Sequence, residues 1–244
     1  MRIVECPSPN HDERPAGTPI DMLVLHYTGM KTGEEALARL CDPAAKVSAH
    51  YTIDRDGRIY RHVPEERRAW HAGVSCWAGE RNVNARSIGI EIVNPGHEYG
   101  YVPFTDQQIE ALIDLSRGIF ARHPITPARV VAHSDVAPAR KEDPGELFPW
   151  KCLSEYGLGV WPDNRSPKNG GHVAGIIASD EAAAALARFG YGVPPEVDVP
   201  MEKVITAFQR HYRTTKIDGI WDDECGHILA GLLEQREAAM QATA

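Results

Sequence analysis

The sequence predicts an α/β (α+β) protein with a mixed central β-sheet flanked by helices, and a small C-terminal domain of three helices. Short apolar runs typical of buried strands alternate with helix-periodic segments as far as residue 150, which favours helices packed on a sheet. The next segment, "WPDNRSPKNGG", is rich in Pro, Asn and Gly and has no hydrophobic periodicity. Beyond it, apolar residues recur only at helical spacing. We therefore predict a first domain over residues 1–160, a linker over 161–177 and a helical domain over 178–244.

The first expected strand lies in "DMLVLHYT". Its apolar run, residues 22–25, ends on His26 and Tyr27, so the strand presents a histidine at its end. "GEEALARLC" follows as a short helix. "SAHYTIDRDGRIYRHV" alternates its larger residues around Asp56 and Gly57, a pair that suits a tight turn, and so predicts an antiparallel hairpin.

A second apolar run, "RSIGIEIVN", predicts another strand and places Glu91 between Ile90 and Ile92. Because side chains alternate along a strand, the carboxylate points to the opposite face from its two neighbours. Further along, "ARVVAHSD" predicts a strand that again ends on a histidine, His133. Two strands thus end on histidine, and a third carries a lone acid.

The helices have recognisable end signals. "FTDQQIEALIDLSRGIFARHP" begins with Thr105 as N-cap and Gln108 as its capping-box partner. In the C-terminal part, Ser179 is the expected N-cap and Gly190 the expected end of the helix in "SDEAAAALARFGYG". Two more helices are predicted, one in "PMEKVITAFQRHYR" and a last one from about Asp223.

The composition excludes some classes of partner. The 244 residues carry a formal net charge of −8, and neither Lys nor Arg forms a run longer than a pair, which argues against nucleic acid or an anionic membrane. No segment approaches the apolar length that spans a bilayer, and the N-terminus lacks the apolar stretch of a signal peptide. We expect a cytoplasmic location, with the periplasm as the alternative.

The cysteines are odd in number and far apart in the sequence: Cys6, Cys41, Cys76, Cys152 and Cys225. None has the spacing of a paired thiolate motif, so we expect reduced thiols, most of them packing residues. Cys76 in "GVSCWAG" is a weak candidate nucleophile because no thiolate-stabilising context is evident around it.

The two strand-end histidines and one acidic loop, "HSDVAPARKEDPG", suggest a metal site. Zinc in catalytic sites takes three protein ligands, commonly imidazole and carboxylate, and leaves one position open. His26 and His133 supply two of them. Asp135 is so close to His133 in the chain that it suits a supporting role better than ligation. Asp143 is better placed, because Pro144 favours an extended backbone at the residue before it.

The remaining charges fit the hydrolysis of an amide. In an extended loop Lys141 projects to the same side as Asp143. A carboxylate can take a proton from a metal-activated water and a cation can stabilise an oxyanion, and we assign these roles to Glu91 and Lys141. Each residue also has a structural alternative: Glu91 as half of an ion pair, and Lys141 as part of a solvated surface. His50 in "SAHY" and His71 in "WHAG" stay rival ligands by spacing alone, and His71 fits the wall of a substrate cleft equally well.

Four motifs occur in order over roughly residues 20–160: "LVLHYT", "VSAHYTIDRDGRIYRHVPEERRAWHAGVS", "NARSIGIEIVN" and "VVAHSDVAPARKEDPGELFPW". Together they resemble the zinc-dependent N-acetylmuramoyl-L-alanine amidases of the AmiD and AmpD type, whose catalytic domain is related to peptidoglycan recognition proteins. The resemblance implies that His26, His133 and Asp143 bind one Zn²⁺ per chain, which demotes His50 and His71 as ligands. It implies the catalytic acid position for Glu91 and the basic position for Lys141. Substrate contacts are assigned to His71, Ala72, Tyr27 and Arg81.

The resemblance also implies the substrate. It is the amide between the lactyl group of N-acetylmuramic acid, or its 1,6-anhydro form, and the L-alanine that begins the stem peptide. Peptidoglycan fragments, the anhydro-muropeptides, are then the expected partners, in cell-wall recycling. The alternative is a non-catalytic muropeptide-binding or sensing protein on the same fold. "VITAFQRHYRTTKIDGIWDDECGHIL" resembles a helical peptidoglycan-binding domain, in which Cys225 and Gly226 replace the usual threonine-containing helix start.

Overall fold

The structure, a computed structural model, describes residues 3–162 and 176–242. Residues 163–175, most of the predicted linker, lie outside the described residues, and the predicted domain boundaries therefore stay predictions. Within the described ranges, no helix combines the length and the apolar character that crossing a lipid bilayer requires.

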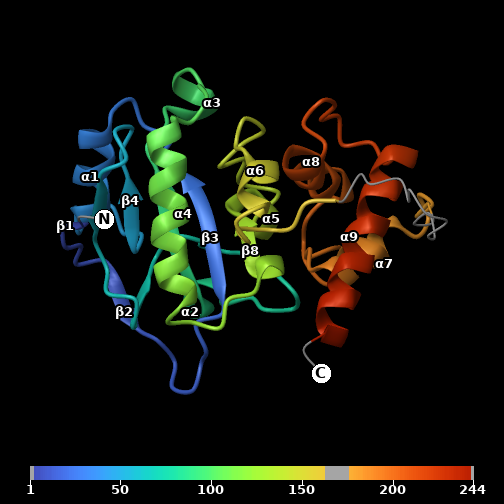
Figure 1. The fold of residues 1–244 in the computed structure, drawn as a ribbon, viewed down its shortest axis with the longest axis horizontal. Coiled ribbons are helices and arrows are strands. Elements are labelled where there is room, and N and C mark those ends of the chain that lie inside the picture. The colour runs from blue at the N-terminus through green and yellow to red at the C-terminus, as the bar shows by residue number, and fades with distance from the viewer. Residues whose placement is uncertain (1–2, 163–175, 243–244) are drawn as a thin grey trace.

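The chain builds one large sheet and one small one (Figure 1). In spatial order the large sheet contains β1 (Ile3–Glu5), β5 (Ile59–Arg61), β4 (Tyr51–Ile53), β7 (Ser87–Ile92), β3 (Met22–Tyr27) and β8 (Val130–Ala132). Only β4 and β5 pair antiparallel, and every other neighbouring pair is parallel, so the predicted mixed sheet is confirmed. The small sheet pairs β2 (His11–Glu13) with β6 (Arg67–Ala69).

The antiparallel pair is the predicted hairpin. The backbone of Asp54 receives the Gly57 N–H and donates to the Arg58 carbonyl, and Gly57 has a φ of +80°, a conformation that glycine adopts without steric cost. The sequence did not predict strands β1, β2 and β6, because each has only three residues and at least two of the three are partly or fully exposed. No apolar run marks them.

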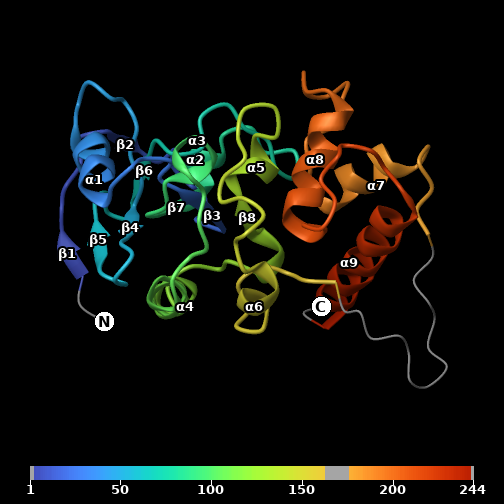
Figure 2. The same cartoon turned by 90° about the horizontal axis from the view of Figure 1, so that it is seen from above.

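Helices cover both faces of the large sheet. The helices of the described residues are α1 (Gly33–Cys41), α2 (Val83–Arg86), α3 (Gly96–Tyr99), α4 (Asp106–Phe120), a 3₁₀ turn (Pro127–Arg129), α5 (His133–Val136), α6 (Trp150–Ser154), α7 (Ala182–Phe189), α8 (Met201–Tyr212) and α9 (Asp223–Ala242). Figures 1 and 2 show α4 and α6 on one face, with α1, α2 and α5 on the other. The capping box of Thr105 and Gln108 forms at the start of α4 as predicted.

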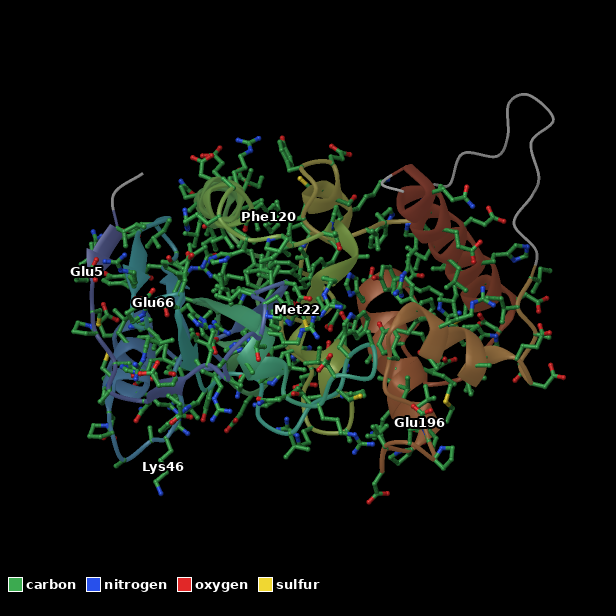
Figure 3. All side chains as sticks on the ribbon, turned by 90° about the horizontal axis from the view of Figure 1, so that it is seen from below. Glu5, Met22, Lys46, Glu66, Phe120 and Glu196 are labelled. Atoms are coloured by element: carbon green, nitrogen blue, oxygen red, sulfur yellow. The ribbon has the colours of Figure 1, made fainter. Side chains whose placement is uncertain are left out.

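Side chains that alternate along β3 belong to two apolar clusters, one on each face of the sheet. Leu23 and Leu25 belong to the apolar cluster under α4, whereas Met22 and Val24 belong to a second cluster on the other face. Met22 lies well inside the molecule among packed side chains, while Glu196 lies at its surface (Figure 3). His26 follows the parity of Met22 and Val24, so its side chain projects away from α4.

The three predicted C-terminal helices are present as α7, α8 and α9, next to the β8 edge of the sheet (Figure 1). They share an apolar cluster with the first part of the chain, in which the Trp77 ring packs edge-on against Phe189 and Tyr191. Gly190 ends α7 as expected. The expected N-cap at Ser179 is wrong: α7 begins after Glu181, without a side-chain cap.

Candidate metal centre and active site

Three side chains converge at the carboxyl ends of β3 and β8. The Nδ1 atoms of His26 and His133 are 2.9 Å apart, and Asp143 Oδ2 lies 3.1 Å from the first and 3.0 Å from the second. All three residues are buried, with exposed fractions of 1%, 3% and 6%. The loop that carries Asp143 is tied to the strand end, since the Ser134 N–H donates to the Asp143 carbonyl at 3.0 Å.

The protons around His26 can be assigned from its neighbours. The Ser87 hydroxyl donates to the Val83 carbonyl at 2.7 Å and therefore accepts from His71 Nε2 at 3.1 Å. His71 Nδ1 is then an acceptor, and it receives the Nε2 proton of His26 at 3.1 Å. This chain leaves the Nδ1 lone pair of His26 directed at the convergence point.

His133 is fixed in the same way. Its Nε2 lies 3.1 Å from the carbonyl oxygen of Ala72, which only accepts, so Nε2 carries the proton and Nδ1 carries a lone pair. Two imidazole lone pairs and a carboxylate oxygen thus face one another within about 3 Å, an arrangement that is repulsive unless a cation lies among them. The donor set of the site therefore fits a metal ion, and the orienting contacts are those that metal-binding histidines commonly have.

The ionisation of the group agrees with this arrangement. Burial and the neighbouring His133 lower the pKa of His26 to about 4, which keeps its ring neutral near pH 7. Burial by itself raises the pKa of the Asp143 carboxyl, so a cation among the three groups is what keeps it ionised. A neutral imidazole and an ionised carboxylate are the forms that bind metal.

Glu91 is in β7 and pairs in register with His26 of β3. Ile88, Ile90 and Ile92 face the α4 cluster, so Glu91 points to the same side of the sheet as the metal-binding group. Its Oε2 is buried without a hydrogen-bond partner among the described residues. Burial and the charge of Asp143 raise the pKa of Glu91 well above its usual range, and the nearby Lys141 charge opposes this rise. An unpartnered carboxyl with a raised pKa suits a proton-transfer role.

Next to His26 lies a cavity of about 410 Å³ that most of these groups line. Glu91, Lys141, Asp143, His71 and His133 contribute to its wall, together with Tyr27, whose hydroxyl lies 3.0 Å from His97 Nδ1. Lys141 is exposed to solvent on the same loop as Asp143. The predicted catalytic and metal-binding residues are therefore brought together at one site.

The residues assigned to substrate contact do not all lie here. Tyr27 and His71 line the cavity. The Ala72 side chain is fully buried, and only its carbonyl serves the site, by holding His133. Arg81 lines a separate cavity and donates to the Glu196 carbonyl, so the structure does not bring it to the metal-binding group.

The two rival ligands have other partners. His50 accepts from the Gly89 N–H at 3.0 Å, is fully buried and has its pKa lowered to about 3 by burial and by Arg14. His71 stands behind His26 as its hydrogen-bond acceptor. Gly89 permits that position, because a Cβ there would lie 2.4 Å from the His71 ring. Burial raises the pKa of the Cys76 thiol, which agrees with its being a weak candidate nucleophile.

Sequence reasoning missed several supporting residues. Ser87 fixes the histidine chain, and Arg140 bonds the Ala72 carbonyl at 3.0 Å. Asp135 accepts from the Ala132 N–H at 2.8 Å and from two C-terminal residues, the Tyr191 hydroxyl at 2.7 Å and His211 Nδ1 at 2.7 Å. No signal near "HSD" in the sequence could have named these partners, because they lie more than 50 positions away.

Residues 16–146, which contain all of these cavity-lining groups, match the family described as Amidase_2, N-acetylmuramoyl-L-alanine amidase. The chain belongs to this amidase family. It is 41% identical over 239 residues to the N-acetylmuramoyl-L-alanine amidase AmiD of Escherichia coli, covering 88% of this chain and 83% of that protein. The 1,6-anhydro-N-acetylmuramyl-L-alanine amidase AmpD of Enterobacter cloacae is 37% identical over 161 residues, which are 59% of this chain and 84% of the relative.

Solved structures of amidases in this family extend the likeness to the C-terminal helices. The E. coli AmiD complex with anhydro-N-acetylmuramic acid-L-Ala-D-gamma-Glu-L-Lys superposes with a TM-score of 0.79 at 40% identity, covering 90% of this chain and 91% of that one. AmpDh3 of Pseudomonas aeruginosa, in complex with anhydromuramic pentapeptide, gives a TM-score of 0.78 at 35% identity, covering 91% and 95%. The mixed sheet and the helices on it are the fold of this family.

Proposed function

We propose that this amidase hydrolyses the bond between N-acetylmuramic acid, or its 1,6-anhydro form, and the L-alanine of the stem peptide. The observation that carries the proposal is the convergence of the His26 and His133 lone pairs on the Asp143 carboxylate, beside an unpartnered Glu91. The substrate class is supported by relatives named for anhydro-muramyl-L-alanine cleavage. Peptidoglycan fragments, as in cell-wall recycling, are the substrates that follow.

His26, His133 and Asp143 are the proposed ligands of one Zn²⁺ per chain, because a set of two imidazoles and a carboxylate is one that catalytic zinc prefers. When bound, zinc supplies Lewis acidity, which lowers the pKa of water and polarises a carbonyl. Glu91 takes a proton from the attacking water and delivers it to the leaving amide nitrogen. Lys141, on the solvent side of the cavity, faces the oxygen on which negative charge develops.

His71 and the Ala72 carbonyl do the orienting. By holding the Nε2 protons of His26 and His133, they keep both lone pairs aimed at the centre before any ligand arrives. Of the four residues assigned to substrate contact, Tyr27 and His71 remain the proposed contacts, because the Ala72 side chain is buried and Arg81 lines another cavity. Both have direct support because they line the cavity.

The test combines metal analysis with mass spectrometry of an anhydro-muropeptide digest. We expect about one zinc per chain and release of the intact stem peptide with a free L-alanine amino group. Chelation should abolish the activity and added Zn²⁺ should restore it, while Glu91→Gln should bind zinc and leave the substrate uncut. Full activity of zinc-free protein would refute the proposal, and tight muropeptide binding without cleavage by the zinc-loaded wild type would favour a sensing protein.

We propose the cytoplasm as the site of action, with the periplasm as the alternative. Fractionation of cells that express the unmodified chain tests this. Recovery of the chain in the periplasmic fraction would overturn it.

A further inference from the structure

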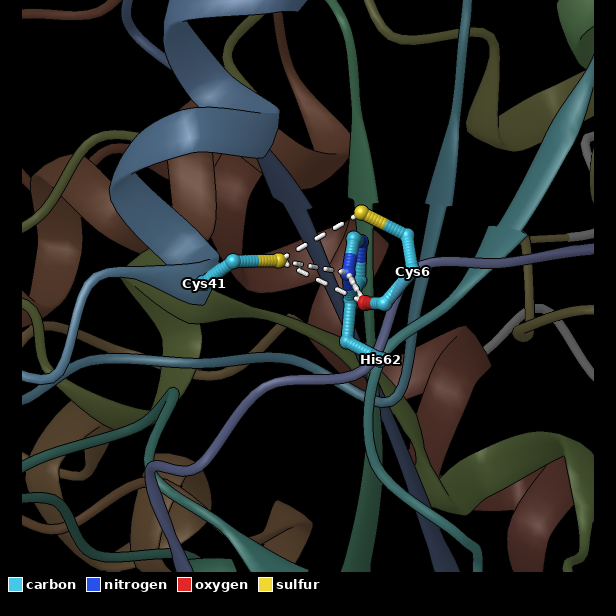
Figure 4. A group of neighbouring side chains, drawn as sticks. All are labelled: Cys6, Cys41 and His62. Atoms are coloured by element: carbon cyan, nitrogen blue, oxygen red, sulfur yellow. Dashed lines mark hydrogen bonds between the residues drawn. The ribbon is translucent and has the colours of Figure 1, made fainter.

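Two cysteines that are 35 positions apart in the sequence meet at the N-terminal edge of the large sheet (Figure 4). Cys6 directly follows β1, and its N–H donates to the Arg61 carbonyl at 2.9 Å. Cys41 is the last residue of α1. Their Sγ atoms are 3.4 Å apart, and Cys41 Sγ is also 3.4 Å from the Cys6 carbonyl oxygen. The two sulfurs are therefore in direct contact.

His62 completes a cluster that has the residue types of a metal site, but its protons are already committed. Nδ1 lies 2.8 Å from the Cys6 carbonyl oxygen, which only accepts, so Nδ1 is the protonated nitrogen. The lone pair is on Nε2, which faces the Thr52 hydroxyl at 2.8 Å and points away from the sulfurs. This is the reverse of His26 and His133, whose lone pairs are directed at their common centre.

We propose that Cys6 and Cys41 form a reactive dithiol that a small disulfide, such as glutathione disulfide, converts to an intramolecular disulfide bond. The Cys6 thiolate attacks one sulfur of the oxidant, forms a mixed disulfide and expels one glutathione thiolate. Cys41 then attacks the Cys6 Sγ and expels the second glutathione. Two protein thiols are oxidised, two glutathione thiols are formed, and they take up the two protons.

The environment assigns the order of the two steps. The Cys41 thiol donates its proton to the Cys6 carbonyl oxygen, and burial and the contact with Cys6 raise the pKa of that thiol to about 12, so Cys41 is a poor first nucleophile. Its thiol loses the proton during the second step, when its sulfur is already beside the mixed disulfide. Both cysteines are partly exposed, so an oxidant of small size has access.

The bond would fix one wall of the substrate cavity. The segment after Cys6 already holds the end of α1, because the Ser8 hydroxyl donates to the Leu40 carbonyl at 2.5 Å and the Asn10 amide donates to the Asp42 carbonyl at 2.8 Å. Arg39 and Leu40, beside Cys41, line the cavity. A disulfide would add a covalent link to a contact that hydrogen bonds already define, so little rearrangement is needed.

The test incubates the zinc-loaded full chain with glutathione disulfide, blocks the remaining thiols and maps tryptic peptides without reduction. We expect the peptide that contains Cys6 to be linked to the peptide of residues 40–46, which contains Cys41. Oxidation should raise the Tm by about 8 °C, as a closed loop of 35 residues predicts. Dithiothreitol should reverse both changes.

Two variants separate this pair from other thiols. Cys6→Ser should lose the linked peptide and the redox-dependent part of the Tm, whereas the matched control Cys152→Ser, at an exposed cysteine, should keep both. The proposal is overturned if Cys6 and Cys41 end as separate glutathione adducts or stay unmodified while Cys152 has reacted. A metal site would also overturn the proposal. It would be shown by Cd²⁺ binding outside the zinc site, by loss of that binding in Cys41→Ser, and by the absence of the linked peptide.

Discussion

Replacing Tyr191 by Phe removes one hydroxyl from a buried carboxylate and leaves the ring in place. Asp135 is fully buried and accepts from the Ala132 N–H, the Tyr191 hydroxyl and His211 Nδ1. A hydrogen bond to a charged group contributes about 1.5–3 kcal/mol, so the free energy of unfolding should fall by about 2 kcal/mol. In a chain of this size that corresponds to a drop in Tm of about 4 °C.

Urea denaturation of the zinc-loaded protein measures this change, as a shift in midpoint at constant m-value. Tyr60→Phe is a matched control. Among the described residues the Tyr60 hydroxyl bonds only to the Arg58 side chain, at 3.2 Å on the surface, so its loss should cost less than about 0.5 kcal/mol. Tyr191→Phe should also weaken zinc binding, since Asp135 lies two residues after His133 in the same short helix. If Tyr191→Phe and Tyr60→Phe prove equally stable, the Tyr191 hydroxyl does not support Asp135.

Three further predictions follow from single contacts. Gly89→Ala should place a Cβ 2.4 Å from the His71 ring and turn His71 away from His26. Zinc affinity, measured by competitive chelator titration, should then fall by about tenfold. Unchanged affinity would contradict the orienting role of His71. Glu91→Gln should leave the Tm equal or higher, because it removes a carboxylate whose buried oxygen has no partner among the described residues. The kcat/KM for muropeptide should fall by about a hundredfold or more. A large loss of stability would assign Glu91 a structural role instead. Burial opposes ionisation of Glu65, but hydrogen bonds from Arg122, Tyr51 and His123 lower its pKa to about 2. The ionised carboxylate therefore contributes about 3 kcal/mol to the free energy of unfolding above pH ~4.5, and this contribution is lost as the pH falls toward 2. Glu65→Gln should flatten the acid limb of stability measured against pH, and an unchanged limb would show that other carboxylates cause it.

Local patterns were enough for much of the fold. The strand of residues 22–27, the hairpin around Gly57, the strand that carries Glu91 and the capping box of Thr105 all follow from neighbours within a few positions, and all are present. The same alternation placed Glu91 on the face opposite its isoleucine neighbours, as observed. Short edge strands such as β1 and β2 were beyond reach because their partners, and not their composition, make them strands.

The sequence by itself determined the candidates for the site: histidines at two strand ends, an acid inside a third strand and a charged loop before Pro144. It left His26, His50, His71 and His133 equivalent in type. The family resemblance pointed to His26 and His133, and the tertiary structure supplies the physical reason, because the direction of an imidazole lone pair depends on what the other ring nitrogen meets. For His26 that is a chain running through His71 to Ser87, and for His133 it is the Ala72 carbonyl, 61 positions away. The contact of Cys6 with Cys41 and the support of Asp135 by Tyr191 have the same origin, since both are made by packing between distant segments.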